Sequence, residues 1–442
     1  MLALSLAAQS AGARDDAPEY TATDIHQAQT ILEDMQKAVT LNYYPEDRIG
    51  KDFDARCAAA ERTLESVHSN SEAFGVIADA LASPDARIRF IPPLRSSRVD
   101  YSWQWQLIGD AAYVTQVDRE GDARKQGLAV GDKIASIEGV TISRENYESI
   151  YYVFHRLAPR PGLRVLVESR GQEPRWLAIA STVRPQRKLT SSGSRTSFWA
   201  AWELSESDRR HRDEFLDLKQ HLHRSGSVAI WRAIELEHDS SAVADGLKEL
   251  KSANALILDL RGVHVRQHDP VLRLLDDLFV DKFTAGTVKR GIRSLTDLQM
   301  RIGSGSGAFQ GTVLVLVDAE TGAYAEVLAR VIQQRQRGVI IGDFTLGRVL
   351  EETQFYQTRG TAFSFATASA LIPTGAVVMA DGVELDGKGV TPDLLLRPTA
   401  ADLAGGRDVM LAKALAMLKQ KVVPEDARKI VRLPSEDDDD NE

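Results

Sequence analysis

Few side chains in this sequence could carry out catalysis. The hydroxyls of Thr321 and Ser369 could act as nucleophiles if a base such as His264 lay within hydrogen-bonding distance. Each residue also has an ordinary role: Thr321 as a helix cap, Ser369 as a strand residue and His264 as a solvated loop residue. The lone cysteine, Cys57, suits a small apolar position on a helix better than it suits nucleophilic chemistry.

Metal and cofactor chemistry has no sequence signal. The nine histidines are scattered, and no group of His, Cys, Asp and Glu has the spacing of a metal site. No glycine-rich phosphate-binding loop is present. We therefore expect neither a metal nor an organic cofactor.

The composition is that of a globular protein. The chain has 442 residues, of which 43% are hydrophobic and 26% charged, enough for about two or three domains. Its formal charge is −9, and six of its last seven residues are acidic. The rest of the chain is therefore close to neutral, which argues against a nucleic-acid partner. Residues 421–442 are predicted to form an acidic disordered tail.

The first residues resemble an export signal. An apolar run at residues 2–8 precedes Ala11-Gly12-Ala13, a small-residue pattern typical of signal peptidase sites, although no Lys or Arg comes before the run. Residues 1–13 are predicted to be a signal peptide, which could be truncated at its start, of a periplasmic or extracellular protein. The alternative is a disordered N-terminus. No later stretch reaches the roughly 18 apolar residues of a membrane span.

Three patterns follow along the chain. Helical spacing of apolar residues between positions 23 and 82 predicts an N-terminal helical domain over residues 21–95, ending near Pro92-Pro93. Residues 97–184 are mainly β, with predicted strands 112–117, 133–137, 163–168 and 175–179 and a predicted helix 143–157. Residues 185–225, a polar segment with Trp199 and Trp202, are predicted to be a linker.

Strands and helices alternate from residue 226 to about residue 420. The predicted strands are 228–234, 255–260, 312–317 and 339–341, and the predicted helices are 241–250, 269–278 and 324–334. Several of these strands are almost wholly apolar, as expected when helices cover both faces of a parallel sheet. These elements predict an α/β core.

The mainly β segment resembles a PDZ domain. The resemblance rests on Gly121-Asp-Ala-Arg-Lys-Gln-Gly127-Leu128-Ala-Val-Gly131-Asp132-Lys-Ile134, followed by Ile137-Glu-Gly139-Val140. PDZ domains bind an extended polypeptide as an added strand. The resemblance implies an amide loop at Trp105, Gln106, Leu107 and Ile108, and a groove wall that includes Tyr147, Ile150, Tyr151 and Phe154. The alternative is a PDZ-like module that packs internally and binds nothing.

Nearly the whole chain resembles the C-terminal processing peptidases, or tail-specific proteases, whose relatives include the tricorn core protease. The motifs are Leu256-Ile-Leu-Asp-Leu-Arg261, the strand 313–317 leading into a helix, Ile341-Gly342-Asp343-Phe-Thr345-Leu-Gly347, the Pro373-Thr374-Gly375 turn and Gly387-Lys-Gly389-Val-Thr-Pro392-Asp393. The resemblance implies a ClpP/crotonase-like α/β core with an inserted PDZ domain and an N-terminal helical domain.

The residues that this family uses for catalysis are replaced. Counting back three places from the family's helix glutamate, Glu326, puts the serine position at Ala323, and the lysine position 25 residues later is Arg348. A methyl group cannot attack a carbonyl, and a guanidinium stays protonated and cannot act as a base. The supporting glutamine position is Glu352, which predicts an Arg348–Glu352 ion pair.

Two further family positions are also changed. The tricorn-like Asp-x-His-Ser-x-Phe stretch reads Asp85-Ala86-Arg87-Ile88-Arg89-Phe90, so that Arg87 replaces the histidine. The oxyanion loop reads Gly262-Val263-His264-Val265-Arg266, with one glycine where backbone amides should turn inward.

These replacements predict a non-catalytic relative, or pseudoprotease. It would capture extended or C-terminal polypeptide segments through its PDZ domain, as an adaptor, regulator or dimer partner of an active protease homologue. One alternative is an active serine-type endopeptidase with a relocated nucleophile. Another is a structural or oligomerisation subunit whose groove is closed by its own chain; the pattern also leaves a homodimer open.

Overall fold

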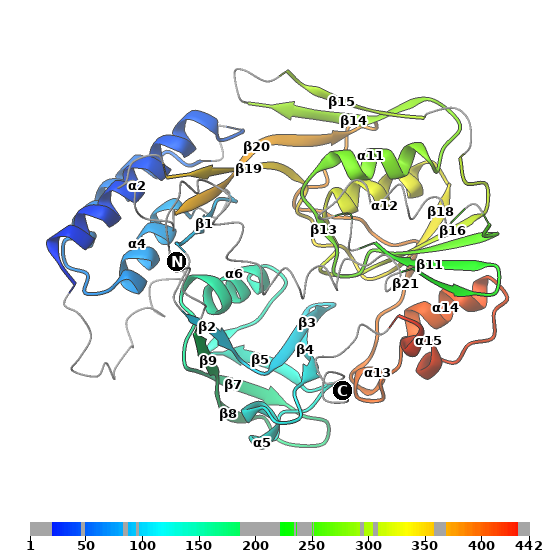
Figure 1. The fold of residues 1–442 in the computed structure, drawn as a ribbon, viewed down its shortest axis with the longest axis horizontal. Helices are drawn as coiled ribbons and strands as arrows, with labels where there is room; N and C mark the ends of the chain where they lie inside the picture. Colours follow the sequence, from blue (N-terminus) through cyan, green and yellow to red (C-terminus); the bar gives the residue numbers. More distant parts are fainter. Residues whose placement is uncertain are drawn as a thin grey trace, which may run out of the picture.

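The computed structural model describes residues 20–45, 49–82, 87–93, 97–185, 222–233, 236, 250, 252–291, 296–303, 308–357 and 368–431. These ranges leave out the predicted signal peptide, residues 241–249 of the predicted helix 241–250, Asp85, Ala86, Trp199 and Trp202. In Figure 1 a group of helices, a β-rich unit and an α/β core surround a central region of connecting loops.

Three helices begin the described chain, as the helical spacing predicts. They are α2 (Ala22–Asn42), α3 (Phe53–Leu64) and α4 (Asn70–Leu81). Thr21 and Ser69 cap α2 and α4, because each hydroxyl accepts a hydrogen bond from an amide of the first turn. Cys57 is buried on α3, and burial raises the pKa of its thiol to about 11. In the described ranges, no helix combines the length and apolarity needed to cross a membrane.

The β-rich unit contains one antiparallel sheet. Its strands in spatial order are β3 (Trp103–Ile108), β4 (Ala111–Val117), β5 (Lys133–Ile137), β7 (Gly162–Glu168) and β8 (Arg175–Ala180), with β6 (Val140–Thr141) on β5. The short helix α5 (Asp122–Lys125) and the helix α6 (Tyr147–Tyr152), continued by a π-helical turn over Val153–Leu157, complete it. The strands β2 (Ser97–Asp100) and β9 (Thr182–Pro185) pair, so that the chain enters and leaves the unit side by side.

The predicted amide loop is wrong, because Trp105 to Ile108 belong to the strand β3. Trp103, Trp105 and Leu107 are buried and alternate with more exposed glutamines. This period of two is the pattern of a strand with one buried face.

The α/β core is built on a six-stranded sheet. Its strands in spatial order are β10 (Leu222–Ser225), β11 (Val228–Arg232), β12 (Ala255–Asp259), β16 (Thr312–Val317), β18 (Gly338–Gly342) and β21 (Leu394–Leu395). Only β10 is antiparallel to its neighbour; the other strands are parallel. The predicted parallel sheet is therefore confirmed.

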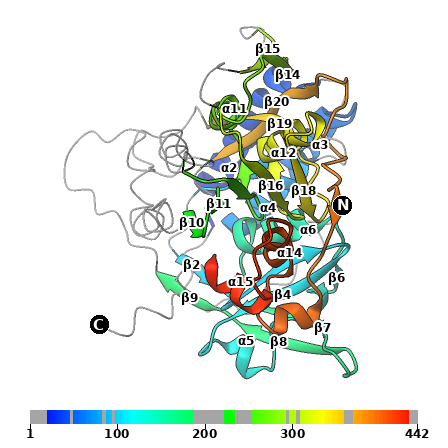
Figure 2. The ribbon, with the colours of Figure 1, turned by 90° about the vertical axis from the view of Figure 1, so that its right-hand side faces the viewer.

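Helices cover both faces of this sheet. They are α11 (His268–Asp276) and α12 (Tyr324–Gln334) on one face, and α14 (Val409–Met417) and α15 (Pro424–Ile430) on the other. The short helix α13 (Ala400–Ala404) lies instead against Gly131 of the β-rich unit. Leu256 and Leu258 pack with α11 and α12, whereas Ile257 and Leu314 pack with α14 and α15. Successive strand residues are thus buried on opposite sides, which explains the continuous apolar runs. Figure 2 shows α14 and α15 between the core and the β-rich unit.

A second, antiparallel sheet was not predicted. It consists of β1 (Arg89–Ile91), β20 (Ser369–Met379), β14 (Phe283–Arg290) and β15 (Leu298–Ile302) in spatial order, with β19 (Leu350–Tyr356) also on β20. The Pro373-Thr374-Gly375 segment, expected to be a turn, lies inside β20. A register shift between Glu351 and Glu352 accommodates the proline, as β-bulges do. Ala370 and Ile372 of β20 also join the apolar core of the N-terminal helices.

Two predicted boundaries are corrected. The end of the predicted linker forms the strand β10, because its backbone pairs with β11. The start of the predicted disordered tail forms α15, which begins at Pro424 and buries Ala427 against the sheet. Residues 432–442 lie outside the described ranges.

Candidate functional site

The turn before α12 keeps a strained backbone at the predicted serine position. Ala323 is the N-cap of α12, 5% exposed, with φ 54° and ψ −129°. A positive φ is unfavourable for a residue with a Cβ, and such strain is typical of nucleophile positions between a strand and a helix. The backbone shape is therefore present, but it presents a methyl group.

Glu326 holds together the two chain segments of this site. Its carboxylate accepts hydrogen bonds from the Thr345 hydroxyl at 2.5 Å, the Gly347 amide at 2.7 Å and the Arg348 amide at 3.0 Å. Burial raises the pKa of Glu326 to about 7, although these donors oppose the shift. The Ala323 amide donates to the Arg348 carbonyl at 3.0 Å, so the serine and lysine positions remain adjacent.

Arg348 forms a buried ion-pair network. Its Nη2 donates to Glu352 Oε1 at 2.9 Å, as predicted, and its Nη1 donates to Glu148 Oε2 on α6 at 3.0 Å. Burial alone would lower the pKa of Arg348, but Glu148 and Glu352 raise it above the usual arginine value. Burial raises the pKa of Glu148, but the charges of Arg348 and Arg89 outweigh this effect and lower it to about 2. Arg348 therefore stays charged and cannot accept a proton.

The former tricorn-like stretch joins this network through a residue that was not predicted. Arg89 of β1 donates to Glu148 Oε1 at 3.3 Å. Arg87, the predicted position, instead lies 3.5 Å from Asp386 Oδ1. Because side chains alternate along an extended strand, only a known strand position for residues 89–91 could have identified Arg89.

The amides of the predicted oxyanion loop are engaged within the protein. The Gly262 amide donates to Asp318 Oδ1 at 3.0 Å, and the Val263 amide donates to the Leu260 carbonyl at 3.1 Å. The strands β13 (His264–Val265) and β17 (Gly322–Ala323) pair in parallel, which ties the loop to the start of α12. Neither Gly262 nor Val263 offers an amide to a tetrahedral intermediate.

His264 is not the solvated loop residue that was predicted. It is partly buried in β13, and its ring covers Gly322, where a Cβ would collide with it. Burial, followed by the charge of Arg348, lowers the pKa of His264 to about 4. The imidazole is therefore neutral at pH 7.

Neither alternative hydroxyl matches a nucleophile. Thr321 is fully buried and its hydroxyl donates to the Leu260 carbonyl at 2.8 Å; it is not the helix cap that was predicted, since Ala323 occupies that position. Ser369 is buried at the start of β20, where its hydroxyl accepts a hydrogen bond from Gln354. Four strand residues, about 13 Å, separate Ser369 from the residue opposite Glu352.

The predicted groove residues form a compact aromatic contact between β3 and α6. The Trp105 ring lies 4.9 Å from that of Tyr147 and 6.4 Å from that of Tyr151, measured between centroids. Ile150 and Phe154 are buried behind these rings, and Tyr151 is 44% exposed. Within the described strands, β3 pairs only with β4, so its other edge carries no strand.

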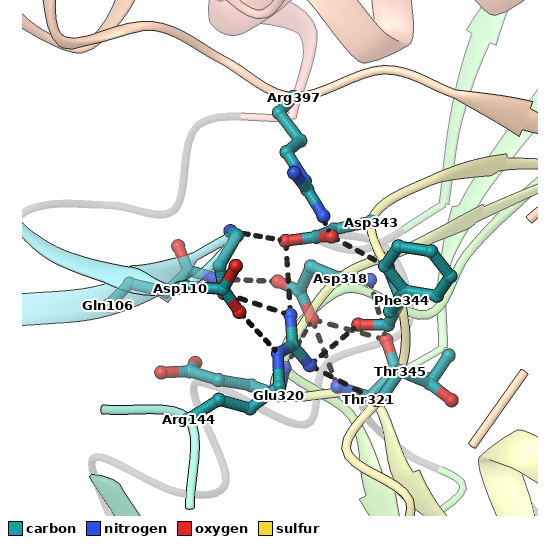
Figure 3. Close-up of polar contacts among 11 residues, drawn as sticks. Gln106, Asp110, Arg144, Asp318, Glu320, Thr321, Asp343, Phe344, Thr345 and Arg397 are labelled. Carbon is teal, nitrogen blue, oxygen red and sulfur yellow. Dashed lines mark hydrogen bonds and ion pairs between the residues drawn. The ribbon is translucent and has the colours of Figure 1, made fainter. Parts of the chain in front are cut away.

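A polar interface fixes the β-rich unit to the core. Asp343 accepts hydrogen bonds from the Gly109 amide at 2.6 Å and from Arg397 Nε at 2.7 Å, and it forms an ion pair with Arg144 at 3.4 Å (Figure 3). Gln106 donates to Asp318 at 2.5 Å in the same region. Sequence reasoning missed this interface, because its partners are far apart in the chain.

Glu320 extends this interface at the start of α6. The Tyr147 hydroxyl donates to its carboxylate. Burial, with a contribution from the charge of Asp318, raises the pKa of Glu320 to about 7.

The α/β core that carries this site also matches a known family in sequence. Residues 224–396 match the family model described as Peptidase family S41. The α/β core is therefore similar to this family, as the motifs predict. No curated protein sequence matches the chain.

Solved structures similar to this chain are distant in sequence. Mature CPAF has a TM-score of 0.63 and 13% identity, over 86% of this chain and 94% of that chain. Mature CPAF complexed with lactacystin has a TM-score of 0.61 and 13% identity, over 86% and 95%. The photosystem II D1 C-terminal processing protease has a TM-score of 0.47 and 17% identity, over 84% and 93%. At such identities, the likeness to the two CPAF structures establishes the fold alone.

Proposed function

We propose that this protein is a non-catalytic relative of the C-terminal processing peptidases that binds extended or C-terminal polypeptide segments. The observation that carries the first half is the network of Arg348 with Glu148 and Glu352. At the position of the family's base, this network places a permanently charged guanidinium, which two carboxylates hold.

Acyl transfer needs a nucleophile, a base and donors for the oxyanion. Ala323 supplies no hydroxyl, Arg348 accepts no proton, and the Gly262 and Val263 amides already have acceptors. The loss of three independent parts supports an inactive site more strongly than the loss of one side chain would.

The second half of the proposal rests on β3 and α6. An unpaired strand edge beside a helix is the arrangement that PDZ domains use to bind a polypeptide by strand addition. The edge of β3 and the exposed Tyr151 on α6 support this mode. The sequence motif from Gly121 to Ile134 supports it independently.

We also propose that the protein is exported. This proposal rests on the apolar residues 2–8 and on Ala11-Gly12-Ala13.

The test of inactivity is the turnover of an unfolded protein substrate. We expect the purified protein to cleave it no faster than a mock preparation from cells that lack this chain. Cleavage that follows the protein through successive purification steps would overturn the proposal, and loss of that cleavage in Thr321→Ala or Ser369→Ala would identify the relocated nucleophile.

A further inference from the structure

Arginines gather around the vacated serine position. Val265 of β13 pairs with Ala323, and Arg266 is the next residue. Val265 is buried, and Arg266, the residue that follows β13, lies close enough to His264 for its charge to contribute to the lowered pKa of that imidazole. Arg266 is exposed, and His264 and Arg89 are partly exposed. These positions can therefore be reached from solvent.

The charges in this arginine cluster, defined as Arg89, Arg266 and Arg348, do not balance. Glu148 pairs with Arg89 and Arg348, and Glu352 pairs with Arg348. Within the described part of the chain, no hydrogen bond or ion pair engages the guanidinium of Arg266. Three guanidiniums face two carboxylates, and His264 is neutral at pH 7, which leaves one net positive charge.

The cluster extends across two elements far apart in the sequence. Burial lowers the pKa of Arg89 and His264, and the charge of Arg266 contributes in the same direction to both. Arg266 therefore lies within electrostatic range of β1 as well as β13. An arginine beside a second guanidinium suits a planar carboxylate, which it can bind with two hydrogen bonds.

We propose that the vacated catalytic position is a binding site for an acidic side chain of a bound polypeptide, contacted by Arg266 and supported by Arg89. This site rests on the proposed function, since its ligand is the polypeptide that the protein captures. An aspartate or glutamate side chain fits better than a C-terminal carboxylate. Chain termini are captured by clusters of open backbone amides, and the Gly262 and Val263 amides are engaged.

The experiment uses the full chain and three labelled peptides in a fluorescence anisotropy titration. The first is an extended peptide with two glutamates and both termini blocked; the second has glutamine in place of each glutamate; the third is the glutamine peptide with a free C-terminus. We expect the acidic peptide to bind about tenfold tighter than either of the others, a preference that weakens with added salt.

Arg266→Glu should abolish the preference for the acidic peptide. Arg170→Glu is the matched control, because Arg170 is an exposed arginine in the turn between β7 and β8. It should leave the preference unchanged. Arg266→Gln, which removes the charge without reversing it, should bind the acidic peptide with intermediate affinity. Circular dichroism verifies that each variant is folded.

The outcomes separate this inference from the proposed function. Equal binding of all three peptides, unchanged in Arg266→Glu, would overturn the acidic site and leave polypeptide binding in place. Tightest binding of the free-terminus peptide would also overturn it. No binding of any peptide would overturn polypeptide binding itself.

Discussion

The turn before α12 and the strand β3 are joined by the hydrogen bond from Gln106 to Asp318, yet they differ in what their functions need. The turn has the backbone shape of a nucleophile site, with Ala323 at φ 54°, but catalysis there would need a hydroxyl that Ala323 lacks. In β3, an unpaired edge offers main-chain hydrogen bonds that do not depend on the identity of one side chain. Under the proposed function, substitutions would therefore remove catalysis from this scaffold and leave its strand edge available to a polypeptide.

Trp105→Ala tests how much the aromatic contact between β3 and α6 stabilises the fold. Trp105 is 5% exposed and packs against Tyr147 and Tyr151. We expect the free energy of unfolding to fall by about 4 kcal/mol, measured by urea denaturation. Trp176→Ala, at a tryptophan that is 49% exposed, should cost about 1 kcal/mol. Equal effects of the two changes would contradict a packed contact.

Arg348→Met tests the network at the former base position. It leaves Glu148 and Glu352 without their cation, and we expect a loss of about 3 kcal/mol in the free energy of unfolding. The triple change Arg348→Met, Glu148→Gln, Glu352→Gln should restore most of it. Arg87→Met, which breaks a more exposed ion pair, should cost less than about 1 kcal/mol. A similar small effect of Arg348→Met would show that the network does not stabilise the fold.

The pH dependence of stability tests the interface between the two regions at Glu320. Its folded pKa of about 7 lies above the unfolded value of 4.5, so its stabilising contribution is complete below pH 4.5 and is lost as the pH rises through 7. Between pH 5 and 8, the unfolding free energy of the native protein should fall by about 2 kcal/mol relative to Glu320→Gln.

The comparison with Glu320→Gln is necessary because His264 acts in the opposite direction. Its folded pKa of about 4 lies below 6.5, so its contribution is present above pH 6.5 and is lost as the pH falls through 4. Parallel pH profiles for the native protein and Glu320→Gln would contradict the raised pKa of Glu320.

The smallest expected effect is that of restoring the two family residues. Ala323→Ser with Arg348→Lys should leave cleavage of an unfolded substrate at background, because the Gly262 and Val263 amides still have acceptors and the restored lysine lies between Glu148 and Glu352. Hydrolysis by this double variant, absent from the unchanged protein prepared in the same way, would show that the loop can reopen. The loss of activity would then be a matter of side chains alone.

Much of the α/β core could be predicted from local pattern. The strand 312–317 and the helix 324–334 are where the sequence predicts them, because apolar runs and helical spacing are properties of neighbouring residues. The antiparallel sheet was missed because β20 contains Pro373 and Gly375, which usually mark turns. A bulge at Thr374, between the residues that pair with Glu351 and Glu352, accommodates them within the strand.

The sequence alone determined that the predicted nucleophile and base positions hold Ala323 and Arg348, because residue type is read directly from the chain. Tertiary structure decided what occupies their place. Glu148 reaches Arg348 from 200 residues away, and Arg266 comes beside Ala323 through a two-residue strand pair. No local pattern predicts such contacts, because they depend on the packing of the β-rich unit against the core.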